Sequence, residues 1–433
     1  MSNLVKNIFY LVTEKFATTF ILLLSNVIVI RYLGVEDFGK LAIFQLYYLL
    51  AVTVSEFGIR RVYSSLKSPS REALIFNQAF NIKLASSIFF LIVAFLYLYI
   101  SNYDIKFYAL LLAFVASPFE IFTYHFEANL KNATLVKIRV SVSLLMALLR
   151  ILLCFTGENN LFYIMLTYAV SNLIINILCV FATRKHKMKI TRVRSRLYRS
   201  TIRKHLFSRS LFFWISVVIV QLNMRTDQFM LSLLAGTASV GIYAGAYKLV
   251  EQLLTIPSLL AGVFLPYISK SQTLDKERYL EKLYLYGLLV SIPISLSLAL
   301  ISPWLIPFLL GKAFTASAPV FAVLMLSLPI LVIVNLSGLY YSIFKLERFA
   351  IIRNAFGLLL SIGLNYFLIK HYGATGAAVS VLISYSCVAF FIEWLVPKTR
   401  QNASIKLKVL MDLLKLNTYQ ELIVNVKAKL LKK

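Results

Sequence analysis

Long apolar segments separated by short polar ones dominate the pattern of the chain. A helix needs roughly 20 apolar residues to cross the hydrocarbon core of a bilayer. The strands of a membrane barrel would instead alternate apolar and polar residues, and these segments do not. The pattern predicts an all-α membrane protein with twelve spanning helices, at about 9–31, 40–58, 79–100, 105–125, 136–156, 161–182, 211–234, 241–267, 283–306, 319–343, 350–369 and 375–396.

Composition supports the same class of protein. Hydrophobic residues make up 60% of the chain, charged residues 15%, and the mean hydropathy is +0.79. A soluble domain is nearer half apolar and a quarter charged. The first segment is too long for a signal peptide and lacks a small-residue cleavage site, so we expect it to remain as a helix.

The charge is strongly positive and unevenly distributed. The formal net charge is +27, and one alternate set of loops, with both termini, holds 35 of the 45 Lys and Arg, whereas the opposite set holds 5. Lys and Arg accumulate on the cytoplasmic side of membrane proteins. We therefore predict that both termini are cytoplasmic. The basic stretch 184–209, with eleven Lys and Arg and no acid, is then a cytoplasmic linker and not a nucleic-acid site.

The two halves of the chain resemble each other weakly. Leu33–Gly39 and Ala235–Gly241 each carry glycines five residues apart, at an offset of 202. A second match joins basic residues eight apart: Lys131 and Arg139, Lys345 and Arg353. Six helices per half is an even number, so the halves form a parallel repeat of two six-helix bundles.

This repeat predicts a division into four parts: an N-terminal bundle over 1–183, a linker over 184–210, a C-terminal bundle over 211–396 and a basic tail over 397–433. Apolar residues recur in the tail at helical spacing, which favours an amphipathic helix on the anionic inner leaflet. The alternative is a solvated tail.

Charges inside the predicted spans are the best candidates for function, because each costs about 2.5–3.5 kcal/mol at a helix centre on insertion scales. Arg150, Arg225 and Lys248 are the candidate substrate-binding cations. Arg31, at the outer end of the first span, is either a cavity rim or an interfacial anchor. Lys83 lies near the cytoplasmic face, where we expect its side chain to snorkel to water.

Three acids also lie inside the predicted spans: Asp227, Glu251 and Glu120. Lys248 and Glu251 are three residues apart and share a helix face. These charges either line an aqueous cavity or form interhelical salt bridges, and the sequence leaves both interpretations open.

Catalytic and metal-binding patterns are not apparent. Cys154, Cys179 and Cys387 lie in apolar runs without metal-ligand spacing, and the chain has no phosphate-cradling loop. We expect no metal, no cofactor and no enzymatic activity.

Short motifs resemble those of a known family. Tyr32–Gly39 follows the first span and Ser55–Ile59 the second. Val240–Tyr243 follows Asp227, and Tyr372–Ala378 opens the last span. In this order, over twelve spans, the chain resembles the Wzx-type lipid-linked oligosaccharide flippases. They form the polysaccharide-transporter branch of the multidrug/oligosaccharidyl-lipid/polysaccharide exporter superfamily, abbreviated MOP.

The resemblance implies a V-shaped pair of bundles that work by alternating access. Because related transporters are commonly ion-coupled, it also implies coupling to H⁺ or Na⁺, for which Asp227, Glu251 and Glu120 are the candidates. It implies a cargo of polyprenyl-diphosphate-linked oligosaccharide, such as an O-antigen repeat unit, moved from the cytoplasmic to the periplasmic leaflet of a bacterial inner membrane. Membrane lipids, a glycan polymerase and a chain-length regulator are the expected partners of a monomeric transporter. The alternatives are a cation-coupled multidrug exporter of the same superfamily and, as an enzyme, a membrane glycan polymerase. The in-span cations favour an anionic cargo over cationic drugs, and no long periplasmic loop supports the polymerase.

Overall fold

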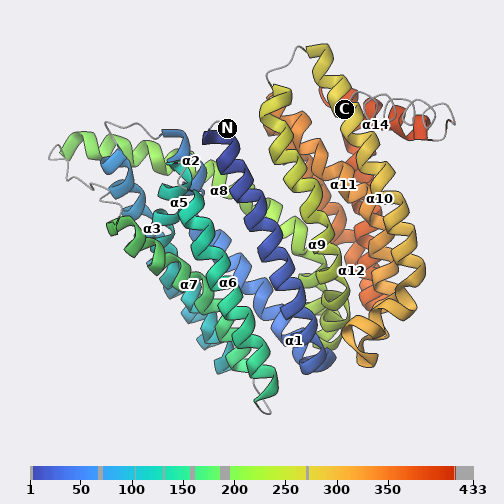
Figure 1. Ribbon diagram of the computed structural model, residues 1–433, viewed down its shortest axis with the longest axis horizontal. Helices are drawn as coiled ribbons and strands as arrows, with labels where there is room; N and C mark the ends of the chain where they lie inside the picture. Colours follow the sequence, from blue (N-terminus) through green and yellow to red (C-terminus); the bar gives the residue numbers. More distant parts are fainter. Residues whose placement is uncertain are drawn as a thin grey trace. The chain divides into compact units, whose positions relative to one another are not determined.

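The computed structural model describes residues 3–66, 72–102, 104–129, 132–156, 161–185, 196–269, 273–413 and 415. These residues form helices joined by short turns, and no strand occurs among them (Figure 1). They pack into two compact units. The first unit is Met1–Gly245 with Leu309–Phe314, and the second is Ala246–Phe308 with Thr315–Lys433.

The helices of each unit follow the order of the chain. The first unit contains α1 (Asn3–Glu56), α2 (Ile59–Leu66), α3 (Glu72–Ile100), η1 (Ile105–Leu110), α4 (Leu111–Ala116), η2 (Ser117–Phe119), α5 (Glu120–Ala128), α6 (Asn132–Phe155), α7 (Leu161–Lys185), α8 (Arg196–Leu234), the start of α9 (Gly236–Ser269) and η3 (Lys312–Phe314). The second unit contains the rest of α9, most of α10 (Thr273–Leu310), α11 (Ser317–Ile343), α12 (Glu347–Ser386), the π-helical turn η4 (Cys387–Ile392), α13 (Glu393–Leu395) and α14 (Arg400–Leu413).

All twelve predicted spans fall on helical segments. Among the described residues, nine helical segments are long and apolar enough to cross a membrane. Two of the nine, Thr13–Tyr63 and Arg348–Leu395, each contain two predicted spans, and α9 covers the span predicted at 241–267. The prediction of an all-α multi-pass membrane protein is confirmed.

Glycine explains why two predicted spans appear within one helix. Gly34 interrupts α1 with φ of 69°, and Gly373 interrupts α12 with φ of 54°. Residues with a Cβ rarely adopt positive φ, so glycine allows the chain to reverse between two spans. These glycines lie in the loop motifs that the sequence analysis identified.

The two glycine motifs of the repeat contact each other in the first unit. A Cβ added to Gly39 would overlap the carbonyl oxygen of Thr237, and a Cβ added to Gly241 would overlap that of Val35. Val35 and Thr237 differ by the same offset of 202 as Gly39 and Gly241, so the contact is reciprocal. The second glycine of each motif therefore permits a close approach of two backbones.

Helix α8 packs within the first unit. Leu206 joins the hydrophobic cluster formed by residues of α2, α3 and α5, and the indole of Trp214 donates a hydrogen bond of 2.9 Å to the carbonyl oxygen of Val54. The basic stretch thus continues into α8 from Arg196, while its residues 186–195 lie outside the described part of the chain. The four-part division predicted from the sequence stays a prediction.

Helix α14 packs on the second unit. It contacts η4, α13 and α11, and it buries Asn402, Ala403, Ile405, Lys406 and Val409. The apolar face of this helix therefore meets protein. Most of the rest of the predicted tail helix, 416–433, lies outside the described residues.

Candidate functional site

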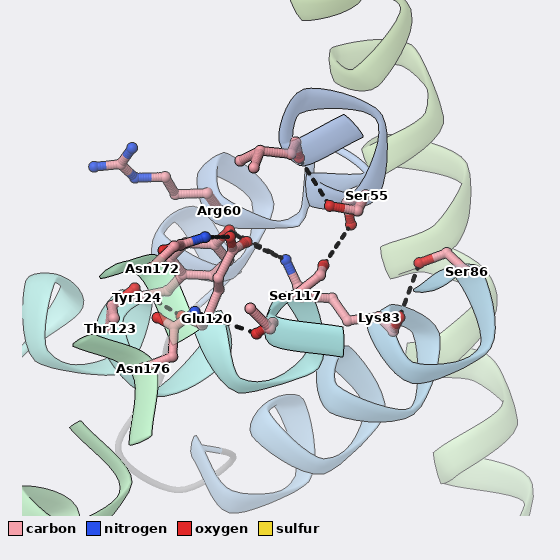
Figure 2. Close-up of polar contacts among 12 residues, drawn as sticks. Ser55, Arg60, Lys83, Ser86, Ser117, Glu120, Thr123, Tyr124, Asn172 and Asn176 are labelled. Atoms are coloured by element: carbon pink, nitrogen blue, oxygen red, sulfur yellow. Dashed lines mark hydrogen bonds and ion pairs between the residues drawn. The ribbon is translucent and has the colours of Figure 1, made fainter. Parts of the chain in front are cut away.

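Glu120 is a buried acid of the first unit with partners on several helices. It is the first residue of α5, directly after the short turn that contains Pro118, and it is 7% exposed. Figure 2 shows that side chains from α3, α5 and α7 surround its carboxylate. Lys83 Nζ lies 2.7 Å from Oε2, the Tyr124 hydroxyl donates to Oε2 at 2.8 Å, and Asn172 Nδ2 donates to Oε1 at 3.3 Å.

Lys83 does not snorkel, so that expectation is wrong. Its side chain is fully buried, and its ammonium group also lies 3.2 Å from the Tyr124 hydroxyl. A charge in the apolar interior is tolerated when it has a partner and further hydrogen bonds. The acid at position 120 supplies that partner, because α3 and α5 are packed side by side.

The backbone around Pro118 is held by polar side chains of neighbouring helices. Asn176 Nδ2 donates to the Ala116 carbonyl at 3.2 Å, and Ser117 Oγ donates to the Ser55 carbonyl at 3.0 Å (Figure 2). These contacts fix the turn that places Glu120 beside Lys83.

A second network lies two helical turns further along α5, at Glu127. Arg60 donates two hydrogen bonds of 2.9 Å to its carboxylate, and Arg139 Nη2 donates a third at 3.0 Å. Arg139 also reaches Glu14 at 3.4 Å. This network connects α1, α2, α5 and α6. Its side chains are partly exposed, so they are more accessible to solvent than the side chains around Glu120.

Arg150 is a buried cation of a different kind. It is 3% exposed, its Nε donates to Thr167 Oγ1 at 2.9 Å, and its guanidinium lies 3.6 Å above the centre of the Tyr168 ring. The Tyr168 hydroxyl in turn donates to Asn26 Oδ1 at 2.8 Å. Among the described residues no carboxylate pairs with Arg150, and its Nη1 is buried without a hydrogen-bond acceptor.

The contacts of Arg150 bear on the two interpretations of the in-span charges. An interhelical salt bridge needs an acid, and the part of the chain that the structure describes places none at Arg150. A guanidinium held by a hydroxyl and an aromatic face is left without a neutralising carboxylate.

The remaining candidates are distributed over both units. In the first unit, Asp227 is 4% exposed and accepts a hydrogen bond from the Tyr243 hydroxyl, which joins α8 to the start of α9. Arg225 is partly buried on α8, and Arg31 is exposed on α1. In the second unit, Lys248 and Glu251 form an ion pair at 3.6 Å on one face of α9, as their spacing predicts.

The second unit contains a buried acid that the sequence analysis missed. Glu393 follows the π-helical turn η4 and is 1% exposed. Arg353 Nη1 lies 2.9 Å from Oε1, and Oε2 receives Lys406 Nζ at 2.6 Å and Asn402 Nδ2 at 2.7 Å. The signal was present in the sequence, because Glu393 is an acid inside the last predicted span, 375–396.

Helix α14 supplies two of those partners from outside the spans. Lys406 also donates to the carbonyl oxygen of Ala389 at 3.0 Å, and Asn402 accepts from the Tyr284 hydroxyl at 2.8 Å. Burial lowers the pKa of Lys406 to about 8, although the charge of Glu393 acts in the opposite direction. The cluster therefore fastens α14 to α10, α12 and α13.

Within the described ranges of the chain, no group of three or more His, Cys, Asp or Glu side chains is arranged to hold a metal ion.

Comparisons with known proteins were made for sequence and for structure. A family model described as "Polysaccharide biosynthesis protein" matches residues 4–272, which is more than half of the chain. A search of curated proteins found no match.

Solved structures of transporters share the fold. The structure of the lipid II flippase MurJ in an inward closed conformation is 17% identical, with a TM-score of 0.69 over 93% of this chain and 91% of that chain. An inward-facing multidrug resistance MATE family transporter of the MOP superfamily is 12% identical, with a TM-score of 0.67 over 90% of this chain and 96% of that chain. A MOP superfamily transporter from Pyrococcus furiosus is 15% identical, with a TM-score of 0.57 over 92% and 96% of the two chains.

Proposed function

Because the chain belongs to the family of polysaccharide biosynthesis proteins, we propose that it is a flippase for a polyprenyl-diphosphate-linked oligosaccharide, such as an O-antigen repeat unit. The sequence-based assignment to the polysaccharide-transporter branch is confirmed, and the chain is a multi-pass membrane transporter of the MOP superfamily. The proposal adds the cargo, and the direction from the cytoplasmic to the periplasmic leaflet.

The observation that carries the proposal is Arg150. It is a buried guanidinium with no carboxylate partner in the described residues and with one nitrogen lacking an acceptor. Guanidinium groups bind phosphate oxygens through charge-assisted hydrogen bonds. A diphosphate is an anion that such a group accommodates, whereas a cationic drug would be repelled by it. MurJ, which shares the fold, is described as a lipid II flippase, and this supports a lipid cargo for the present chain.

The other candidate residues take roles around this one. We assign Arg225, Lys248 and Arg31 to the path of the anionic head group, and Asp227, Glu251 and Glu120 to coupling with H⁺ or Na⁺. No organic cofactor or metal is needed for such a transporter, and no covalent chemistry is assigned to the protein. We place it in the bacterial inner membrane as a monomer with both termini cytoplasmic, beside a glycan polymerase and a chain-length regulator.

The direct test is deletion of the gene in a strain without a second flippase of this type. The proposal expects loss of surface glycan and accumulation of lipid-linked repeat units on the inner leaflet. Unchanged glycan display would refute it. Unchanged display combined with increased sensitivity to cationic drugs would indicate the multidrug exporter instead.

Variants of Arg150 test its role in the same strain. Arg150→Ala should reduce surface glycan at least tenfold at an unchanged amount of protein in the membrane, because the head group loses its buried charge. Arg348→Ala removes an exposed arginine and serves as the matched control. Thr167→Ala removes only a hydrogen bond to Arg150. If Thr167→Ala abolished display as completely as Arg150→Ala, the arginine would be a structural residue.

Topology is tested separately with reporter fusions. A reporter fused after Ser210, in the basic part of α8, should be active in the cytoplasm. A periplasmic signal at that position would reverse the proposed orientation.

A further inference from the structure

A cavity of about 660 Å³ lies in the first unit, between α3 and the first turns of α8. Its volume is within the range of small-molecule and cofactor sites. Phe89 and Phe207 line the cavity and are also exposed at the protein surface. The cavity is lined by Phe57, Asn81, Ile82, Ala85, Ser86, Phe89, Phe90, Ser200, Arg203, Lys204 and Phe207.

The lining is apolar at one end and basic at the other. Helices α3 and α8 run in the same direction here, because Leu206 packs in one cluster with Ile82 and, two turns later, Trp214 lies 6.1 Å from Phe90. The polar lining residues come early on both helices, and the rings of Phe89 and Phe90 come late on α3. The cavity therefore has a head with Arg203 and Lys204 and an aromatic tail.

No acid is found among the residues that line the cavity, so the positive charge of Arg203 and Lys204 is not neutralised within it. Both side chains are exposed on α8, in the basic stretch that the sequence places at the cytoplasmic face. Basic residues at this level attract anionic headgroups. The aromatic end, by contrast, offers nothing to a soluble anion.

We propose that this cavity binds one anionic glycerophospholipid of the inner leaflet, for which phosphatidylglycerol is the probe. Its phosphate lies on Arg203 and Lys204, with Ser200 and Asn81 as further hydrogen-bonding groups. One acyl chain lies against Phe57, Phe89 and Phe90. This site is separate from the proposed cargo site at Arg150 and does not depend on the identity of the cargo.

The position of the cavity gives the lipid a consequence for the buried ion pair. Ser86 lines the cavity and donates a hydrogen bond of 3.0 Å to the carbonyl oxygen of Lys83, whose ammonium group holds Glu120 (Figure 2). A bound lipid therefore supports the turn of α3 that carries Lys83. Because a ligand that binds only the folded state stabilises it by mass action, phosphatidylglycerol should also raise the unfolding temperature of the whole protein.

Trp214 provides a built-in probe for the test. Its indole lies 5.5 Å from Phe57 and 6.1 Å from Phe90, two rings of the cavity wall, whereas Trp304 and Trp394 are exposed in the second unit. The full-length protein with Trp304→Phe and Trp394→Phe is reconstituted in phosphatidylcholine nanodiscs. A minor fraction of the lipid is then replaced by phosphatidylglycerol or phosphatidylcholine carrying brominated acyl chains, and quenching of Trp214 fluorescence is measured.

We expect brominated phosphatidylglycerol to quench Trp214 several-fold more than brominated phosphatidylcholine at the same low fraction, with saturation. The double variant Arg203→Ala/Lys204→Ala should remove that difference. Arg209→Ala, an exposed arginine on α8 outside the cavity, should retain it. Equal quenching by the two lipids in the starting protein would mean ordinary bilayer contact and would overturn the proposal.

A second arm separates lipid sources. Unbrominated polyprenyl phosphate is added as a competitor, and it should displace brominated phosphatidylglycerol no better than unbrominated phosphatidylglycerol does. Preferential displacement by the polyprenyl lipid would assign the cavity to a cargo tail and would also overturn the proposal. Flippase activity is not read in either arm, so failure here leaves the proposed function untouched.

Discussion

Each unit contains a buried carboxylate that pairs with a buried lysine, and the two carboxylates are neutralised differently. Glu120 in the first unit pairs with one cation, Lys83, and receives a hydroxyl and an amide. Glu393 in the second unit lies between two cations, Arg353 and Lys406, and receives an amide. The first arrangement is a one-to-one ion pair, whereas the second buries one more positive than negative charge.

The side chains also come from different places. The partners of Glu120 lie on α3, α5 and α7, which carry predicted spans. The pair therefore connects helices that are themselves predicted to cross the membrane. Lys406 and Asn402 lie on α14, beyond the last span. The comparison shows two uses of a buried ion pair. Lys83–Glu120 holds spanning helices of one unit together, whereas Lys406–Glu393 attaches α14, which lies beyond the last predicted span, to the other unit.

The largest effect is expected for removal of the acid with two cations. Glu393→Leu leaves Arg353 and Lys406 buried without a counter-charge, and breaking a buried pair in this way costs about 3–5 kcal/mol. The unfolding temperature in detergent should fall sharply, and protease should cleave at α14. Glu281→Gln is the control, because its pair with Lys408 is exposed and worth at most about 1 kcal/mol. An equal fall in unfolding temperature for Glu393→Leu and Glu281→Gln would show that the buried pair is no more important for stability than the exposed one.

A smaller loss is expected for the one-to-one pair. Lys83→Met leaves Glu120 with the donors Tyr124 and Asn172, so the cost should be nearer the value of one charged hydrogen bond, about 1.5–3 kcal/mol. The double variant Lys83→Met/Glu120→Leu removes both charges and should recover most of the lost stability. Thermal unfolding of the two single variants and the double variant measures this coupling. Additive losses would show that the two charges do not interact.

The third prediction concerns pH and belongs to the second unit alone. The pKa of Lys406 is lowered by burial from 10.5 to about 8, so the folded chain loses this proton earlier than the unfolded chain as pH rises. Between these values the unfolded state holds more protons, and raising the pH favours folding by up to about 1.4 kcal/mol per pH unit. Below about pH 8 both states carry the charge, and the contribution is constant.

The measurement compares unfolding temperatures from pH 7.5 to pH 9.5 in the parent protein and in Lys406→Met. The difference between parent and variant should shift in favour of the parent as pH rises. A pH-independent difference would mean that Lys406 stays protonated throughout.

The smallest effect is expected at the arginines that the repeat relates. Arg139 corresponds to Arg353, but its side chain is 25% exposed against 7% for Arg353. Arg139→Ala should therefore lower the free energy of unfolding by about 1 kcal/mol. This loss should be smaller at high salt than at low salt, because water and ions screen the pairs of Arg139 with Glu127 and Glu14. Arg353→Ala should cost more and show little salt dependence. A reversed order in thermal unfolding would break the proposed relation between burial and stability.

The sequence predicted the helices well and the depth of individual charges poorly. Twenty apolar residues in a row have few structural alternatives in lipid, so all twelve spans fall on helix. Gly34 and Gly373 belong to the sequence motifs, and both adopt positive φ in the structure. Lys83 was misplaced because depth along a helix does not indicate whether an acid on a neighbouring helix faces it.

Glu393 was missed for a related reason. Its two cations lie far apart in the sequence, Arg353 at the start of the span predicted at 350–369 and Lys406 in the predicted tail. Only the fold brings them together around Glu393. Arg150 was identified correctly as a buried charge, but its partners, a hydroxyl and a ring, have no charge pattern that a sequence could reveal. The roles proposed for the seven candidate residues remain predictions.

The reciprocal contact of Gly39 and Gly241 has the form of an isologous dimer interface. In such an interface residue i of one copy meets residue j of the other, and j meets i; here Gly39 meets Thr237 and Gly241 meets Val35 within one chain. Fusion of two copies into one gene frees the two sides to differ. Lys40, which pairs with Glu36 and Asp37, has Ile242 as its counterpart, and the two acids have Ala238 and Ser239. The two glycines thus preserve the reciprocal backbone contact because they lack side chains. The charged residues beside that contact occur in only one of the two motifs.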